Sequence, residues 1–242
     1  MLAEQKFFVG VLDCGTGRIL KNRALLEDMS DTATVHSNLV GESWEKLAEQ
    51  HLVWVVTNIK LKVFKRVPYT SCITVRTWSR GYNPAFANRD FEAYAEDGSL
   101  IAKATSNWMI LNTARNFPQR LNAELMDPYQ SEPDRISFPD FQFKNADLSG
   151  LQILKTVFFT VSKSMIDCNS HVHNSSYLDI ACEALPEGMD EQDFTDVEIS
   201  YKKEVKPAQR VRLDYAEEGD TCYVLIHSED SETLHTVIRM RR

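Results

Sequence analysis

A short motif occurs twice in the sequence, and this repetition limits the folds open to the chain. Residues 13–17 and 167–171 both begin with Asp-Cys, but glycines in the first copy replace the Asn and His of the second. An apolar run precedes each copy and a segment of helical spacing follows it. We therefore expect a duplicated fold in which only the second half keeps the polar groups that chemistry needs.

Both halves carry the same order of elements. Apolar spacing predicts helices over residues 19–33 and 175–185. Alternating or apolar runs predict strands at 7–9, 58–68, 73–78, 86–95, 100–111, 158–161, 196–207, 211–215, 221–227 and 233–241. Aligning Pro68 with Pro207, which end corresponding strands, sets Lys65 opposite Glu204. The prediction is an α+β fold, a long antiparallel sheet wrapped around one helix, made twice.

Four prolines and many charges set the middle of the chain apart. We interpret residues 115–150 as a linker between an N-terminal repeat at 1–114 and a C-terminal repeat at 151–242. The 242 residues suffice for two domains of about 100–130 residues each.

Composition excludes several classes of function. The net charge of −8 argues against general nucleic-acid binding, which needs a basic face. No apolar run approaches the roughly 18–20 residues of a membrane span. The five cysteines are scattered without CxxC, and the start lacks the features of a signal peptide, so we expect free thiols in the cytoplasm. No third metal ligand accompanies the two histidines at 171 and 173, so neither a metal nor a cofactor is expected.

The polar residues of the second copy suit hydrolysis of an activated acyl group. An extended trace would place Asp167, Asn169 and His171 on one side. Asn169 can hold a carbonyl, with help from N–H groups of the following helix, while His171 and Glu204 prepare a water. Each of these residues can also be interpreted as a helix cap or a surface group without a catalytic role. Asp167 in particular resembles a turn residue, because Asp13 survives in the first copy.

Cys168 also has two readings. It could act as a nucleophile close to His171. Because Cys14 stands at the same place in the degenerate copy, we favour a buried structural thiol.

Six motifs, in order along the chain, resemble those of the plant and bacterial acyl-ACP thioesterases. They are Trp-Val-Val-Thr at 54–57, Thr-Trp at 77–78, Asn-Arg-Asp-Phe at 88–91, Ala-Lys-Ala-Thr-Ser-Asn-Trp-Met at 102–109, Asp-x-Asn-x-His-Val-x-Asn-x-x-Tyr at 167–177 and Tyr-Lys-Lys-Glu at 201–204. The resemblance implies a tandem hot-dog fold that releases fatty acid from acyl carrier protein in fatty acid biosynthesis. It implies catalytic roles for Asp167, Asn169, His171 and Glu204.

Two positions depart from the family. His173 stands where the family commonly has Asn, and Val205 stands where the plant enzymes have a Cys once proposed as nucleophile. The second departure favours attack by water without a covalent Cys intermediate.

Substrate and partner contacts follow from the same resemblance. In the family the acyl chain lies largely in the N-terminal hot dog; the candidates for its lining, each equally readable as plain core, are Leu25, Met29, Val55, Trp108 and Ile110. Acyl carrier protein is acidic, so docking needs a local basic surface. The basic residues that cluster in sequence are Lys202, Lys203, Lys206, Arg210 and Arg212.

Three further alternatives remain open at this point. An acyl-CoA thioesterase or a non-catalytic acyl-binding protein could use the same scaffold, and a dehydratase fits the residue set less well. A tandem repeat already supplies two hot dogs, so the chain could act as a monomer or as a homodimer.

Overall fold

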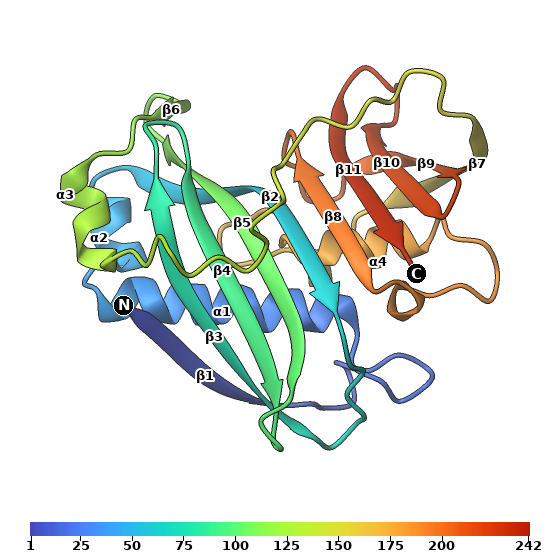
Figure 1. Ribbon diagram of the computed structural model, residues 1–242. Helices are drawn as coiled ribbons and strands as arrows, with labels where there is room; N and C mark the ends of the chain where they lie inside the picture. Colours follow the sequence, from blue (N-terminus) through green and yellow to red (C-terminus); the bar gives the residue numbers. More distant parts are fainter.

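Two halves of the molecule lie side by side and share one sheet in the computed structural model, which describes residues 1–242 (Figure 1). The elements of the first half are β1 (Leu2–Phe8), α1 (Asn22–Leu39), α2 (Trp44–Glu49), β2 (Leu52–Val63), β3 (Cys72–Tyr82), β4 (Ala87–Ala95) and β5 (Leu100–Asn112). Those of the second half are β7 (Ile153–Thr160), η2 (Lys163–Met165), α4 (Ser176–Cys182), η3 (Glu191–Asp193), β8 (Asp196–Tyr201), β9 (Arg210–Glu218), β10 (Thr221–Ser228) and β11 (Leu234–Arg241).

A single antiparallel sheet runs through both halves. Its strand order is β1-β3-β4-β5-β2-β8-β11-β10-β9-β7. β2 and β8 join the halves, with Ile59 opposite Ile199 and Leu61 opposite Val197. We call this pairing the seam. The predicted α+β architecture, a long antiparallel sheet against a helix in each half, is confirmed.

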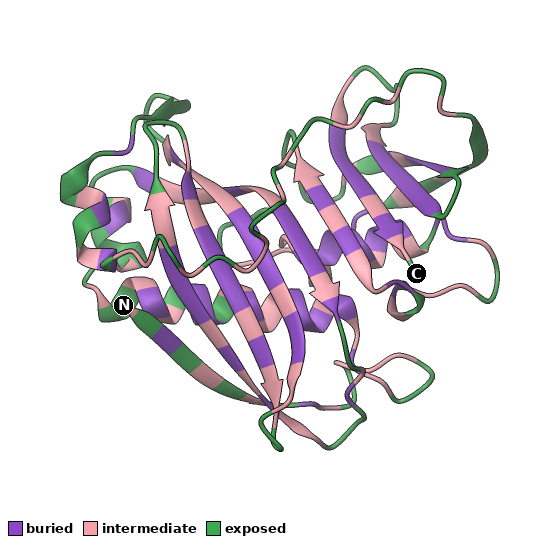
Figure 2. Ribbon diagram, in the orientation of Figure 1, coloured by how far each residue is buried: buried purple, intermediate pink, exposed green.

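Side-chain alternation explains why these segments are strands. Along the middle of the sheet, buried positions alternate with partly exposed ones (Figure 2). Ile59, Leu61 and Val63 all lie on the buried face, as the sequence pattern predicts. This face packs against the two helices.

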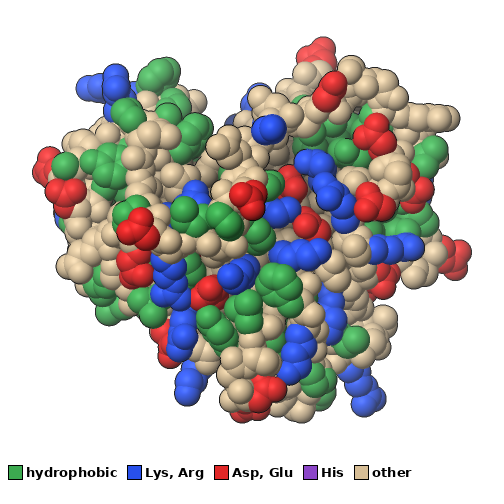
Figure 3. Space-filling model, viewed as in Figure 1, with side chains coloured by type: hydrophobic (Ala, Val, Ile, Leu, Met, Phe, Trp, Pro, Cys, Tyr) green, Lys and Arg blue, Asp and Glu red, His purple; other side chains and the backbone are tan.

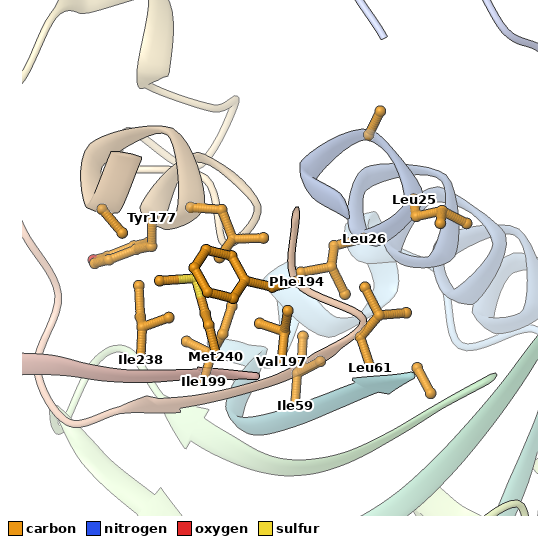
Figure 4. Packing of buried hydrophobic residues seen from close by; sticks show 14 of the residues in the cluster. Leu25, Leu26, Ile59, Leu61, Tyr177, Phe194, Val197, Ile199, Ile238 and Met240 are labelled. Atoms are coloured by element: carbon orange, nitrogen blue, oxygen red, sulfur yellow. The ribbon is translucent and has the colours of Figure 1, made fainter. Parts of the chain in front are cut away.

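The core is continuous across the seam. One cluster of 39 buried residues draws on both halves. Phe194, fully buried, lies between α1 and α4, and Ile59, Ile199 and Met240 pack beneath it from the sheet (Figure 4). The two halves therefore share one core rather than packing as separate domains.

The helices differ from the sequence prediction in length. α1 begins after Leu20 because Ile19 and Leu20 form isolated bridges with Pro68 and Cys14. It continues to Leu39, past the predicted end at residue 33, because tertiary packing buries polar residues such as His36. The second helix is shorter than predicted, with 7 residues in α4.

Two further differences concern the strands and the linker. The predicted strand at 196–207 ends at Tyr201, because the N–H groups of Lys202 and Lys203 both bond to the carbonyl of His235. The linker region contains β6 (Phe117–Gln119), α3 (Ala123–Met126) and η1 (Asp127–Tyr129), and it crosses the outer face of the sheet. The domain boundaries at 114 and 151 stay a prediction.

No helix of this structure has the length and apolar character needed to cross a membrane. No cluster of three or more His, Cys, Asp or Glu side chains is arranged to hold a metal ion.

Candidate active site

The loop at residues 167–171 is a tight turn built around the carboxylate of Asp167. Its backbone closes where the Asp167 N–H donates to the His171 carbonyl at 2.9 Å, and Ser170 takes the left-handed region with φ 65°. Asp167 Oδ1 accepts from the N–H of Asn169 at 2.9 Å and of His171 at 3.3 Å. Asp167 therefore fixes the backbone of both candidates rather than the side chain of Asn169.

His171 meets the carboxylate that the sequence analysis assigns to water activation. Its Nε2 lies 2.8 Å from Glu204 Oε2, and the two side chains are 47% and 48% exposed. Glu204 comes from the irregular segment after β8, not from the strand itself. The pair thus joins two distant segments at a position open to water.

A buried tyrosine holds the segment that carries Glu204. The hydroxyl of Tyr177, on α4, accepts the N–H of Val205 at 3.1 Å, and burial raises the pKa of Tyr177 to about 12. Tyr201 packs edge-to-face against Tyr177 with ring centroids 5.3 Å apart, and its hydroxyl donates to the carbonyl of Asn174 at 2.8 Å. These two rings anchor the segments on either side of the site.

Asn169 stands at a cavity that lies mainly in the first half. The cavity encloses about 190 Å³ between α1, α2 and the sheet. Residues of the second half that line it are Asp167, Asn169, His173 and Asn174. Residues of the first half that line it include Ala33, Thr34, Ser37, Trp44, Leu47, Leu52, Trp54, Arg89, Trp108, Met126 and Tyr129. A long apolar substituent could enter here with its polar end beside Asn169.

His173 reaches the same carboxylate from the cavity side. Its Nδ1 lies 3.5 Å from Asp167 Oδ2, so Asp167 contacts the backbone of the loop with one oxygen and this imidazole with the other. His173, which stands where the family commonly has Asn, therefore lies in the wall of the cavity.

The inner wall contains a buried cation. Arg89, 8% exposed, donates to Nδ1 of His36 at 2.9 Å and lies over the ring of Tyr129. Burial lowers the pKa of Arg89 to about 10, and burial with the Arg89 charge lowers the pKa of His36 to about 3. His36 is therefore neutral and accepts from the guanidinium, which leaves one positive charge in this wall.

Of the five candidates for the acyl lining, the structure places only Trp108 on the cavity. Leu25 and Met29 lie in the main core, and Ile110 lies in a smaller cluster beside the cavity. Val55 does not line it, whereas its neighbour Trp54 does. Contact of these residues with an acyl chain stays a prediction.

The backbone N–H groups at the start of the second helix are only partly free, and their role in holding a carbonyl stays a prediction. α4 has only two turns, and the N–H groups of Ser176 and Leu178 already bond to the carbonyls of His173 and Ser175. The N–H groups of Asn174 and Ser175, just before the helix, have no acceptor in the protein. The free backbone N–H groups therefore belong to Asn174 and Ser175, which directly precede the helix.

The counterpart loop of the first half is built differently. A side chain at Gly15, which corresponds to Asn169, would fall 2.2 Å from Nε2 of Gln192. Asp13 accepts from the N–H of Gly10 and does not reach the residues that correspond to Asn169 and His171. Asp13 and Asp167 therefore make different contacts. The presence of Asp13 in the first half does not show which role Asp167 has.

Cys168 is exposed, so its reading as a buried thiol is wrong. The turn directs the side chain outward, and no hydrogen bond joins it to His171. Val205, in contrast, is fully buried.

The basic residues near Glu204 are only partly free. Arg210 and Arg212 are paired with Glu229 and Asp214 at 2.8 and 2.9 Å. Lys203 and Lys206 have no carboxylate within ion-pair distance. On the face shown in Figure 3, acidic and basic side chains are interspersed.

The sequence did not single out Trp44 or the part of α1 beyond residue 33. Trp44 belongs to no motif, and a polar helical turn gives no apolar signal. Trp54 and Arg89 stand within motifs of the family resemblance, but only the structure shows that they line the cavity.

Two family models match most of the chain. Residues 2–129 match the family model of the acyl-ACP thioesterase N-terminal domain, and residues 154–240 that of the C-terminal domain. Oleoyl-acyl carrier protein thioesterase 2 of Arabidopsis thaliana is 23% identical over 219 residues, which are 83% of this chain and 59% of the relative. The chain thus spans about three fifths of the curated relatives it matches.

Two solved structures share the complete fold. A putative oleoyl thioesterase from Lactobacillus plantarum has a TM-score of 0.85 at 23% identity and covers 100% of this chain and 95% of its own. An acyl-ACP thioesterase from Bacteroides thetaiotaomicron has a TM-score of 0.86 at 18% identity and covers 99% and 97%. The tandem hot-dog architecture expected from the sequence is confirmed by these likenesses.

Proposed function

This chain belongs to the acyl-ACP thioesterase family, and we propose that it hydrolyses the thioester of a fatty acyl group on acyl carrier protein and releases the free acid. The observation that carries the proposal is the His171–Glu204 contact of 2.8 Å, two residues from Asn169 at the mouth of the cavity. His171 and Glu204 supply a proton acceptor, and Asn169, two residues from His171, supplies a carbonyl ligand beside a partly apolar cavity.

In the proposed reaction a water attacks the thioester carbon. Glu204, with His171, takes the proton of that water as the C–O bond forms. The amide of Asn169 donates to the carbonyl oxygen as it becomes negative, and the free N–H of Asn174 in the same wall supports that role. The C–S bond then breaks with its electron pair on sulfur, and His171 returns the proton to this thiolate to give the thiol of the carrier. Asp167 acts by fixing the loop.

We propose that no covalent intermediate forms. Val205, where plant relatives carry Cys, has no nucleophilic group and is fully buried. Cys168 is exposed but is not hydrogen-bonded to a base. Cys168→Ser should therefore keep near-wild-type turnover, and no acyl group should remain bound to denatured enzyme.

For docking of acidic carrier protein we propose Lys203 and Lys206, with Lys202 beside them. They flank Glu204 in sequence, and none of the three has a carboxylate within ion-pair distance, although Lys202 Nζ donates to Asn145 Oδ1 at 2.8 Å. Their charge is therefore available to a partner. A single chain contains every group named here, so we propose that a monomer suffices.

The decisive experiment compares Glu204→Gln and His171→Ala with wild type on a panel of acyl carrier protein thioesters. Loss of a positioned general base lowers kcat by about 100- to 10,000-fold. Near-wild-type rates for both variants would refute the proposal. Thioesters of CoA form the second arm: faster release from CoA would favour the acyl-CoA alternative, and no turnover on either would favour a binding protein.

A further inference from the structure

We propose that Trp44 is a positioning residue that sets the orientation of the Asn169 carboxamide for catalysis. This inference rests on the proposed function of Asn169. The indole N–H of Trp44 lies 3.1 Å from Asn169 Oδ1 and is the contact that joins α2 of the first half to the loop of the second.

The chemistry of the two groups decides which way the amide faces. An indole N–H can only donate, whereas a carboxamide has one accepting end and one donating end. The oxygen of Asn169 must therefore face Trp44. Its NH₂ group then faces away from the indole, and it makes no hydrogen bond to the protein. That free donor is the group the proposed reaction needs for the thioester carbonyl.

Local structure holds the short helix that carries the indole. Trp44 is the first residue of α2, whose N-cap, Ser43, accepts from the N–H of Lys46 at 3.3 Å. Leu47, on the same short helix, is buried in the smaller apolar cluster beside the cavity. Trp44 itself is 55% exposed, so its ring adds little to the core. Its fixed contact with Asn169 is thus better explained by the site than by packing.

The test is Trp44→Phe, which keeps an aromatic ring and removes the donor. Losing one neutral hydrogen bond should lower kcat by about 2- to 13-fold with KM nearly unchanged. In an Asn169→Ala background the same change should alter kcat less than about 2-fold, because the positioned group is gone. Glu49→Ala, an exposed change on the same helix, is the control and should match wild type.

An unchanged kcat in Trp44→Phe, or an equal loss in both backgrounds, would overturn the inference. A second measurement does not depend on activity. Among the indole N–H resonances of the 4 tryptophans, Asn169→Ala should shift the one that Trp44→Phe removes. If that resonance does not move, the contact is absent in solution. If wild type releases no acid while the resonance shifts, the proposed function fails and the positioning contact stands.

Discussion

Tyr177→Phe tests whether one buried hydroxyl holds the catalytic segment in place. The change leaves the ring packed against Tyr201 but removes the acceptor for the N–H of Val205, a residue with no exposed surface. A buried donor without a partner costs about 1–3 kcal/mol. For a chain of this length that corresponds to a fall of about 2–12 °C in Tm.

The same change should affect catalysis. Val205 follows Glu204 directly, so a loosened segment spends less time with its carboxylate near His171. We expect kcat to fall several-fold while KM, set by the cavity, changes little. Urea unfolding, thermal melting and acid release from the acyl thioester are the assays.

A matched control is available in the first half. Tyr69, 37% exposed, has a hydroxyl without a protein partner, so Tyr69→Phe should change stability by less than about 0.5 kcal/mol and leave kcat unchanged. If Tyr177→Phe is as stable and as active as this control, the buried hydrogen bond does not position the site.

The remaining predictions concern charge, pH and the seam. Lys203→Glu with Lys206→Glu should lower kcat/KM for the carrier-bound substrate and flatten its decline with salt, measured from 50 to 500 mM NaCl; an unchanged salt profile would remove both residues from docking. Burial raises the pKa of Glu191 to about 7 from the usual 4.5. Between these two pH values the folded carboxyl keeps a proton that the unfolded chain has lost. The free energy of unfolding should therefore fall as pH rises from 4.5 to 7. Glu191→Gln should lose less stability than wild type between pH 4.5 and 7.5 in urea titrations, and parallel losses would contradict the assignment. Ile199→Ala should cost about 2–5 kcal/mol in one cooperative transition, because its cavity opens in a core common to both halves; two separate transitions would show that the halves unfold independently.

Local patterns predicted most of the architecture because strand alternation and the repeat are properties of neighbouring residues. Ile59, Leu61 and Val63 share a buried face as expected. The seam itself was not predictable in this way. It depends on Asp196 to Ser200 pairing with a strand that lies more than a hundred residues earlier, and no local pattern specifies such a partner.

The sequence also predicted part of the candidate site, as it predicted part of the fold. The motif and the family resemblance supplied Asn169, His171 and Glu204, but not how they are held. Asp167 acts on backbone N–H groups, which sequence does not distinguish from contact with a side chain. The acyl lining was predicted poorly, because Leu25 and Met29 have the same apolar character as residues on a cavity wall, and only depth in the fold separates them.

The seam also changes how many strand edges the molecule leaves unpaired. Each half alone would be an open sheet with two unpaired edges, and such edges are templates for further strand addition. Pairing β2 with β8 covers one edge of each half, so the main strand path ends at β1 and β7, and the three-residue β6 pairs beside β5 off this path. β7 has an irregularity between Ile153 and Lys155 and carries that lysine along its edge, both of which disfavour regular pairing with another strand. Joining the two half-sheets through β2 and β8 thus pairs one long edge strand of each half. Either half expressed alone should therefore aggregate more readily than the intact chain.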